Sequence, residues 1–269
     1  MSPTPSFLAP AVASAMRILE YLAQSPDAGL AEISAALELN KSTCFNILSA
    51  LAGFGVVIKL PSAQYKLGPK LIELGTAARR KFTHRAAMRE RLHDLVETFG
   101  VTAVVGQMLE DQTRIVIVDR IAGPRESDIA PAIGQTYELT APALGRVALS
   151  SLDPEEALEI VRRTARSKSK TGDSVWRAQL DAIRRVGFAT SEQEYRSGVN
   201  AVAAAVGWFG EPTTVIGLVG RIKDLPTSRL SQAGRRLVLL ARELEDFAAS
   251  GGKLQDGFKI VRTRTARRA

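Results

Sequence analysis

The chain has 269 residues, 45% of them hydrophobic, which suffices for one large domain or two ordinary domains with buried cores. A single cysteine, Cys44, excludes an intrachain disulfide framework, and with only two histidines we expect no Cys/His metal cluster. The net charge of +8 and the isoelectric point near 9.9 fit a nucleic-acid partner, but the excess lies in residues 161–200 and in the tail from 251, so a solubilising surface explains it equally well.

Neither a secretory leader nor a membrane span is expected. The apolar stretch FLAPAVASAM near the N-terminus has no positive residue ahead of it. The longest apolar region, 201–220, contains Glu211 and Pro212 and fits two strands around a turn better than a membrane helix. The sequence therefore predicts a soluble, cytoplasmic protein that does not bind a membrane.

The first 67 residues have the element order of a winged helix-turn-helix. We expect a flexible segment at residues 1–10, followed by helices at 12–24, at 30–37 and from 41 onward. Two short strands are expected next, at 56–60 and 64–68. Asn40 is the expected N-cap of the third helix. Three helices with a tight turn between the second and third, followed by a two-stranded wing, define this motif.

The third predicted helix has two different faces. An apolar stripe of Cys44, Ile47, Leu48 and Leu51 follows helical spacing and should be buried. We expect the other side to contact double-stranded DNA through Lys41, Ser42, Thr43, Phe45, Asn46 and Ser49. Such a face suits a major groove. The hydroxyls of Ser42 and Thr43 and the backbone amides of the first turn would bind phosphate. The Asn46 side chain would pair with an adenine edge, and the Phe45 ring would contact a thymine methyl.

A second interpretation of this helix stays open. Phe45 could instead pack on the wing, and the small domain could then serve as a protein-interaction module. Arg79, Arg80 and Lys81 in the following segment fit a solvated surface better than a phosphate clamp.

The remainder of the chain predicts a helical linker at 68–98, with Pro69 in its first turn, and an α+β domain at 99–250. Within that domain the strands are expected at 101–109, 113–121, 201–209 and 213–220, and the helices at 141–152, 153–163, 174–187 and 231–250. Residues 162–174 form a polar basic loop, and 251–269 form a basic tail that is expected to be flexible.

Several segments, taken in order, resemble the IclR family of bacterial transcriptional regulators. They are LNKSTCFNILSALAGFGVV, YKLGPKLIELG, VDRIAG, LTAPALGRVAL, RRVGFATSEQEYRSGVNAVAAAV and TVIGLVG, within residues 12–249. The resemblance implies a DNA-binding N-terminal domain and an effector-binding C-terminal domain of GAF-like or profilin-like fold. It also implies homodimers or dimers of dimers, and it implies no cofactor.

In that family the effector lies between the sheet and the N-terminus of a helix, which here begins in ELTAPALGRV. The resemblance places the amides of Ala143, Leu144 and Gly145 against a ligand carboxylate, with Thr140 as N-cap or as a hydrogen-bonding group. An ordinary helix that uses Gly145 only for close packing fits this segment equally well.

Polar contacts typical of small-acid binders in the family are missing. Such proteins carry an acidic residue at the position of Ser191, a cysteine at Ala201, and serines near Gly217 and Val219. A pocket without these groups suits an apolar or aromatic acid, with lining from Met108 and Ile129. The same losses also fit a sensing domain that binds no ligand.

An enzyme is not expected, and no catalytic or metal-binding residue is assigned. Cys44 lies on the buried stripe, both histidines lie in the linker segment, and no phosphate-binding or dinucleotide-binding fingerprint is present. The sequence thus predicts a ligand-responsive transcriptional regulator, either repressor or activator, that binds operator DNA and a small-molecule effector. The alternatives are a winged-helix protein-interaction module and a regulator whose effector domain binds nothing.

Overall fold

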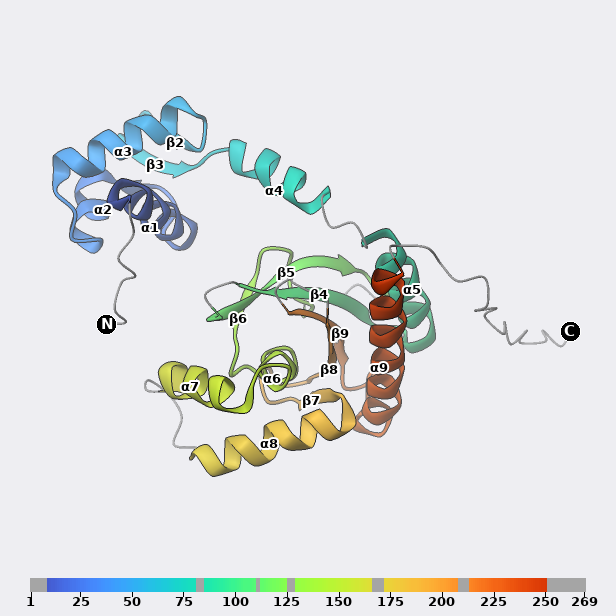
Figure 1. Cartoon of the computed structure of the whole chain (residues 1–269). Helices are drawn as coiled ribbons and strands as arrows, with labels where there is room; N and C mark the ends of the chain where they lie inside the picture. The colour runs from blue at the N-terminus through green and yellow to red at the C-terminus, as the bar shows by residue number, and fades with distance from the viewer. Residues whose placement is uncertain are drawn as a thin grey trace, which may run out of the picture. The chain divides into compact units, whose positions relative to one another are not determined.

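The computed structural model describes residues 9–80, 85–109, 112–124, 129–165, 172–207 and 213–250 (Figure 1). The chain forms two units, Met1–Phe82 and Thr83–Ala269. The predicted two-domain α+β class is confirmed, with a small winged helix-turn-helix and a larger domain built on an antiparallel sheet. Some segments discussed from the sequence lie outside the residues or side chains that the structure describes. They are Arg79, Arg80 and Lys81, much of the basic loop, the Glu211-Pro212 turn and the basic tail.

The N-terminal unit consists of three helices, a small sheet and a fourth helix. Its helices are α1 (Pro10–Gln24), α2 (Leu30–Ala36), α3 (Lys41–Gly53) and α4 (Lys70–Arg80). The antiparallel sheet has the order β1-β3-β2, with β1 at Ala28–Gly29, β3 at Gln64–Leu67 and β2 at Val57–Lys59. The wing therefore has a third strand, β1, which the sequence did not predict because two residues show no alternation.

Packing in a compact core and a capping motif at the C-terminal end fix the position of α3. Ile18 of α1, Ile33 of α2 and Leu48 of α3 are completely buried together. The helix ends where Gly55 adopts a φ of 70°, and the Val56 amide donates to the Leu51 carbonyl at 3.0 Å. This is the Schellman arrangement, and the left-handed residue that it needs is glycine.

The C-terminal unit is organised around a six-stranded antiparallel sheet in the order β6-β5-β4-β9-β8-β7. The strands are β4 (Thr102–Met108), β5 (Arg114–Ile121), β6 (Thr136–Glu138), β7 (Phe188–Glu192), β8 (Val199–Val206) and β9 (Thr214–Arg221). The central strands β4 and β9 are buried along almost their whole length, so helices must cover both faces. Strands β6 and β7 at the two edges were not predicted from the sequence.

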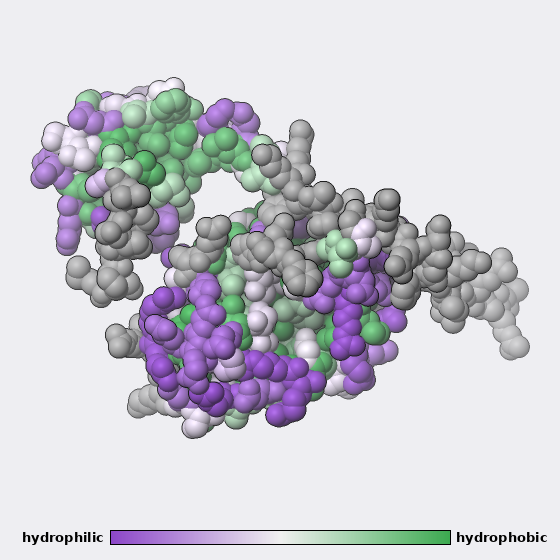
Figure 2. All heavy atoms as spheres, in the orientation of Figure 1, coloured by the Kyte–Doolittle hydropathy of each residue, from purple (hydrophilic) through white to green (hydrophobic). Residues whose placement is uncertain are grey.

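Helices cover the two faces of this sheet in separate groups (Figure 1). One face packs against α5 (Arg85–Phe99) and α9 (Thr227–Ala249), and the other against α6 (Leu144–Ser150), α7 (Pro154–Ala165) and α8 (Asp173–Val186). Figure 2 shows hydrophilic side chains over the outer faces of α7 and α8, as expected for amphipathic helices.

The segment predicted as one linker, 68–98, is divided between the two units as α4 and α5. Helix α5 belongs to the C-terminal core, where Leu92 is completely buried and Phe99 nearly so. Arg89 of α5 also donates to the buried carboxylate of Asp119 in β5, at 3.0 and 3.1 Å. Among the described residues, no helix contains an apolar stretch long enough to cross a bilayer.

Candidate functional site

The outer face of α3 is exposed to solvent as the sequence predicted. Cys44 and Leu48 are completely buried, and burial raises the pKa of the Cys44 thiol, so it remains a protonated core residue. The exposed residues of the helix include the whole predicted DNA-binding set, Lys41, Ser42, Thr43, Phe45, Asn46 and Ser49.

Phe45 lies outside the apolar core of the N-terminal unit and is 46% exposed. A ring in that position is available for an external contact. Asn40 occupies the N-cap position but its side chain makes no capping hydrogen bond. The first-turn amides of α3, together with Lys41 and Ser42, therefore form an end that can accept a phosphate group.

The wing adds two cations that were not identified from the sequence. Lys59 of β2 and Lys66 of β3 are exposed, and the Lys59 ammonium lies 6.0 Å from the centre of the Tyr65 ring. Both lysines are visible in the sequence of the two predicted strands. Lysines on an exposed hairpin are common, however, and only the position of the wing next to α3 in the fold makes these two candidates for a DNA contact.

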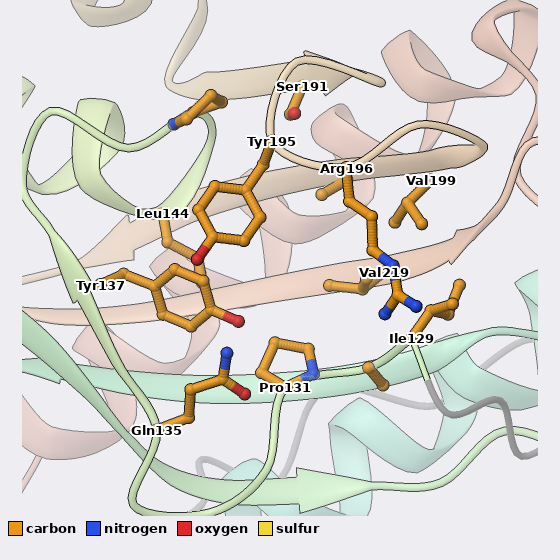
Figure 3. A pocket seen from close by; sticks show the side chains of 13 residues that line it. Ile129, Pro131, Gln135, Tyr137, Leu144, Ser191, Tyr195, Arg196, Val199 and Val219 are labelled. Atoms are coloured by element: carbon orange, nitrogen blue, oxygen red, sulfur yellow. The ribbon is translucent and has the colours of Figure 1, made fainter. Parts of the chain in front are cut away.

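The C-terminal unit contains a pocket of about 140 Å³ (Figure 3). Its walls come from the segment before β6, from β6 itself, from the start of α6, and from β7, β8, β9 and the loop between β7 and β8. The lining residues are Ile129, Ala130, Pro131, Gln135, Tyr137, Pro142, Leu144, Ser191, Tyr195, Arg196, Val199, Ala201 and Val219.

Half of the predicted effector-binding residues line this pocket, namely Ile129, Leu144, Ser191, Ala201 and Val219. The other half, which do not line it, are Thr140, Ala143, Gly145, Gly217 and Met108. The N-cap of α6 is Ala143 rather than Thr140, and it has a φ of 59°. Gly145 serves close packing, because a Cβ at this position would lie 2.3 Å from the Leu139 carbonyl oxygen.

Polar side chains enter the pocket from positions that sequence reasoning missed. Tyr137 and Tyr195 meet edge to face, with ring centroids 5.2 Å apart, and Gln135 lies beside them (Figure 3). Arg196 is the charged residue among the lining residues. The four polar groups missing at the family positions therefore do not leave the pocket without polar side chains, because Tyr137, Tyr195 and Arg196 also line it.

The Tyr137 hydroxyl is kept protonated. Burial, and then the nearby Tyr195, raise its pKa from 10.0 to about 12, although a hydrogen bond with Gln135 acts in the opposite direction. At neutral pH this group is therefore a hydrogen-bond donor at the pocket wall.

This shift predicts an alkaline loss of stability. Because the folded-state pKa is higher than the ordinary value, Tyr137 contributes stability that is present below about pH 10 and lost as the pH rises towards about 12. We expect the free energy of unfolding, measured by denaturant titration, to fall less steeply across this range for Tyr137→Phe than for the wild type. Equal slopes for the two proteins would contradict the assignment.

Among the described residues, no group of three or more His, Cys, Asp or Glu side chains is placed to hold a metal ion. The two assembled surfaces are thus an exposed helix face in one unit and a small, mostly apolar pocket in the other.

Comparison with known proteins places both surfaces in context. Residues 11–61 match the IclR helix-turn-helix domain, and residues 77–247 match the C-terminal domain of bacterial transcriptional regulator IclR. The glycerol operon regulatory protein of Streptomyces griseus is 30% identical over 226 residues, which are 82% of this chain and 86% of that protein.

Solved structures show the same fold. An IclR transcriptional regulator from Alicyclobacillus acidocaldarius has a TM-score of 0.76 and 26% identity, covering 90% of this chain and 100% of that chain. An IclR homolog from Microbacterium hydrocarbonoxydans, crystallised in complex with 4-hydroxybenzoate, has a TM-score of 0.65 and 15% identity, covering 89% of this chain and 99% of that one.

Proposed function

This chain belongs to the IclR family of bacterial transcriptional regulators, and from that premise we propose that its effector is a single-ring aromatic acid. The protein is a DNA-binding transcriptional regulator, not an enzyme, and its C-terminal domain is an effector-binding domain. The ligand class is inferred from the pocket, which is the observation that carries this proposal.

The size of the pocket favours one ring. Apolar cavities of roughly 150 Å³ hold a benzene molecule, and this pocket measures about 140 Å³. A flat ring would contact the aliphatic side chains of Ile129, Val199 and Val219, with the tyrosine pair at one side. The family member crystallised with 4-hydroxybenzoate lends support, because that ligand is also a single-ring acid.

The polar groups favour an acid. We assign the carboxylate to the Arg196 guanidinium, since a charge-assisted hydrogen bond is stronger than a neutral one. The protonated Tyr137 hydroxyl and the buried Ser191 hydroxyl would bind polar substituents of the ring. A short aliphatic acid would leave the aliphatic wall unfilled and would lose the corresponding burial energy.

On DNA, we propose that two chains act together. The α3 helices of a homodimer would enter major grooves of a palindromic operator whose half-sites are about 34–36 Å apart, or a multiple of that distance. The effector can change operator affinity only by its differential affinity for two arrangements of the protein, typically about 1–3 kcal/mol.

The decisive experiment is fluorescence anisotropy on DNA from upstream of the chain's own gene, against random duplex, at about 150 mM salt. We expect preference for the upstream DNA and a shift of its binding curve by benzoate but not by pyruvate. A shift by pyruvate alone would overturn the aromatic assignment. No preference over random DNA would instead support a protein-interaction role for the winged helix.

Arg196→Gln tests the carboxylate assignment directly. We expect benzoate affinity, measured by calorimetry, to fall about 10-fold to 100-fold, because a hydrogen bond to a charged group contributes about 1.5–3 kcal/mol. Binding of benzyl alcohol, which has the ring without the charge, should be unchanged. Arg185→Gln on the exposed side of α8 is the matched control and should change neither affinity.

A further inference from the structure

The loop between β7 and β8, residues 193–198, forms one wall of the pocket while its own side chains are exposed to solvent. Both Tyr195 and Arg196 belong to this loop, and Tyr195 is 60% exposed. A wall made of exposed loop residues has few buried contacts of its own, so its position depends on whatever holds it.

The base of the loop is closed by hydrogen bonds. The Gln193 amide donates to the Val199 carbonyl at 3.0 Å, and the Gly198 amide donates to the Gln193 side-chain oxygen at 3.1 Å. Gln193 and Gly198 both have positive φ, at 59° and 77°, so the chain turns sharply at each end of the loop. These bonds define where the loop begins and ends, and the Val199 amide also donates to the Arg196 carbonyl at 3.2 Å. Glu194 and Tyr195 at the tip make further contacts through their side chains.

An ion pair joins the tip to α6. The two nitrogens Nη1 and Nη2 of Arg146 donate to the two carboxylate oxygens of Glu194, at 3.2 and 2.6 Å. Such a two-point contact fixes orientation as well as distance. Because α6 begins at Leu144, which also lines the pocket, the pair links the loop wall to the helix wall.

Burial makes this ion pair more than a surface contact. The Arg146 side chain is only 22% exposed, and its Nε is buried without a hydrogen-bond partner among the described residues. The negative charge of Glu194 thus offsets the desolvation cost of burying most of the Arg146 guanidinium. Removing the carboxylate would leave a largely buried cation unpaired, which favours a rearrangement of the loop or of the arginine.

We propose that Glu194 is a positioning residue for effector binding: its ion pair with Arg146 holds the 193–198 loop so that Tyr195 and Arg196 line the pocket. The inference rests on the proposed function in so far as the ligand is an aromatic acid. Glu194 itself does not line the pocket, so its effect on a ligand must act through its neighbours.

The sign of the effect separates positioning from simple electrostatics. Neutralising Glu194 removes a negative charge from the loop that carries Arg196, and electrostatics alone would then strengthen binding of an anion. Loss of positioning has the opposite effect, because the loop must be ordered at the expense of binding energy. Loss of positioning also weakens binding of a neutral ring, whereas the change in charge alone would leave the affinity for a neutral ring unchanged.

The experiment compares wild type, Glu194→Gln and the exchanged pair Glu194→Arg with Arg146→Glu in the full-length protein. For Glu194→Gln we expect benzoate and benzyl alcohol affinities each to fall about threefold to tenfold, and the exchanged pair to recover part of the loss. The matched control is Glu192→Gln, which makes the same charge change at a carboxylate that contacts Thr227 instead. Tighter benzoate binding by Glu194→Gln, or unchanged affinities, would overturn the proposal.

Hydrogen exchange on the ligand-free protein makes the test independent of the ligand. We expect the hydrogen-bonded amides of Gln193 and Gly198 to exchange about tenfold faster in Glu194→Gln, with no change in α9. Unchanged exchange would overturn the positioning role. If wild type binds no benzoate, the aromatic-acid assignment fails, and the exchange rates alone then decide whether Glu194 positions the loop.

Discussion

Replacing Gly145 with alanine is expected to abolish benzoate binding and to lower the melting temperature by roughly 5–10 °C. The added Cβ would lie 2.3 Å from the Leu139 carbonyl oxygen and 2.7 Å from that of Glu138. These are backbone atoms and cannot rotate away, so α6 must move relative to β6. Since α6 carries Leu144 and β6 carries Tyr137, the pocket changes shape.

The thermal effect follows from the cost of overpacking. Forcing one methyl group into a filled space costs about 1–3 kcal/mol, and contact with backbone places this site near the upper value. Differential scanning calorimetry and benzoate titration measure the two consequences. The control is Gly75→Ala on the exposed side of α4, where a Cβ meets nothing within 4 Å. Wild-type melting and binding for Gly145→Ala would show that α6 can shift freely.

Replacing Asn46 with alanine is expected to reduce operator affinity about 10-fold to 100-fold with little effect on random duplex. Asn46 lies on the exposed face of α3, and a bidentate contact with an adenine edge contributes roughly 1–3 kcal/mol of discrimination. Fluorescence anisotropy on both DNAs measures the ratio of operator affinity to random-duplex affinity for the wild type and the variant. Equal losses on operator and random DNA would contradict base recognition by this amide.

Lys41→Ala provides the contrasting case on the same helix. A phosphate contact carries no sequence information, so its loss should weaken binding to operator and random DNA alike. The slope of log affinity against log salt should become shallower by about one, since one fewer phosphate is neutralised. Together the two variants separate recognition from charge on the α3 face.

The α3 face was predictable from the sequence because the pattern is local. Residues three and four apart on a helix share a face, so Cys44 and Leu48 specify the buried side and leave Phe45 and Asn46 outside. The long strands and helices of the second unit were predicted for the same reason. Strands of two, three or five residues at the sheet edges carried too little alternation to be recognised, which applies to β1, β6 and β7.

The pocket was only half predictable, because its members come from distant segments. Tyr137 belongs to one edge strand of the sheet and Tyr195 follows the other edge strand, yet their rings lie 5.2 Å apart. Nothing in the spacing of these residues along the chain indicates that meeting. The family resemblance covered the whole segment from β7 to β8 and singled out Ser191 and Ala201 at the pocket wall, but it did not single out Tyr195 or Arg196.

The sequence by itself determined the two domains, the regulator family and the exposed face of α3, since each depends on short-range periodicity or on segments in a recognisable order. Only the tertiary structure decided which side chains enclose the pocket and that Glu194 pairs with Arg146. The physical reason is that a pocket and an ion pair between a loop and a helix depend on how strands are ordered in the sheet, and that order brings together residues that no local pattern relates.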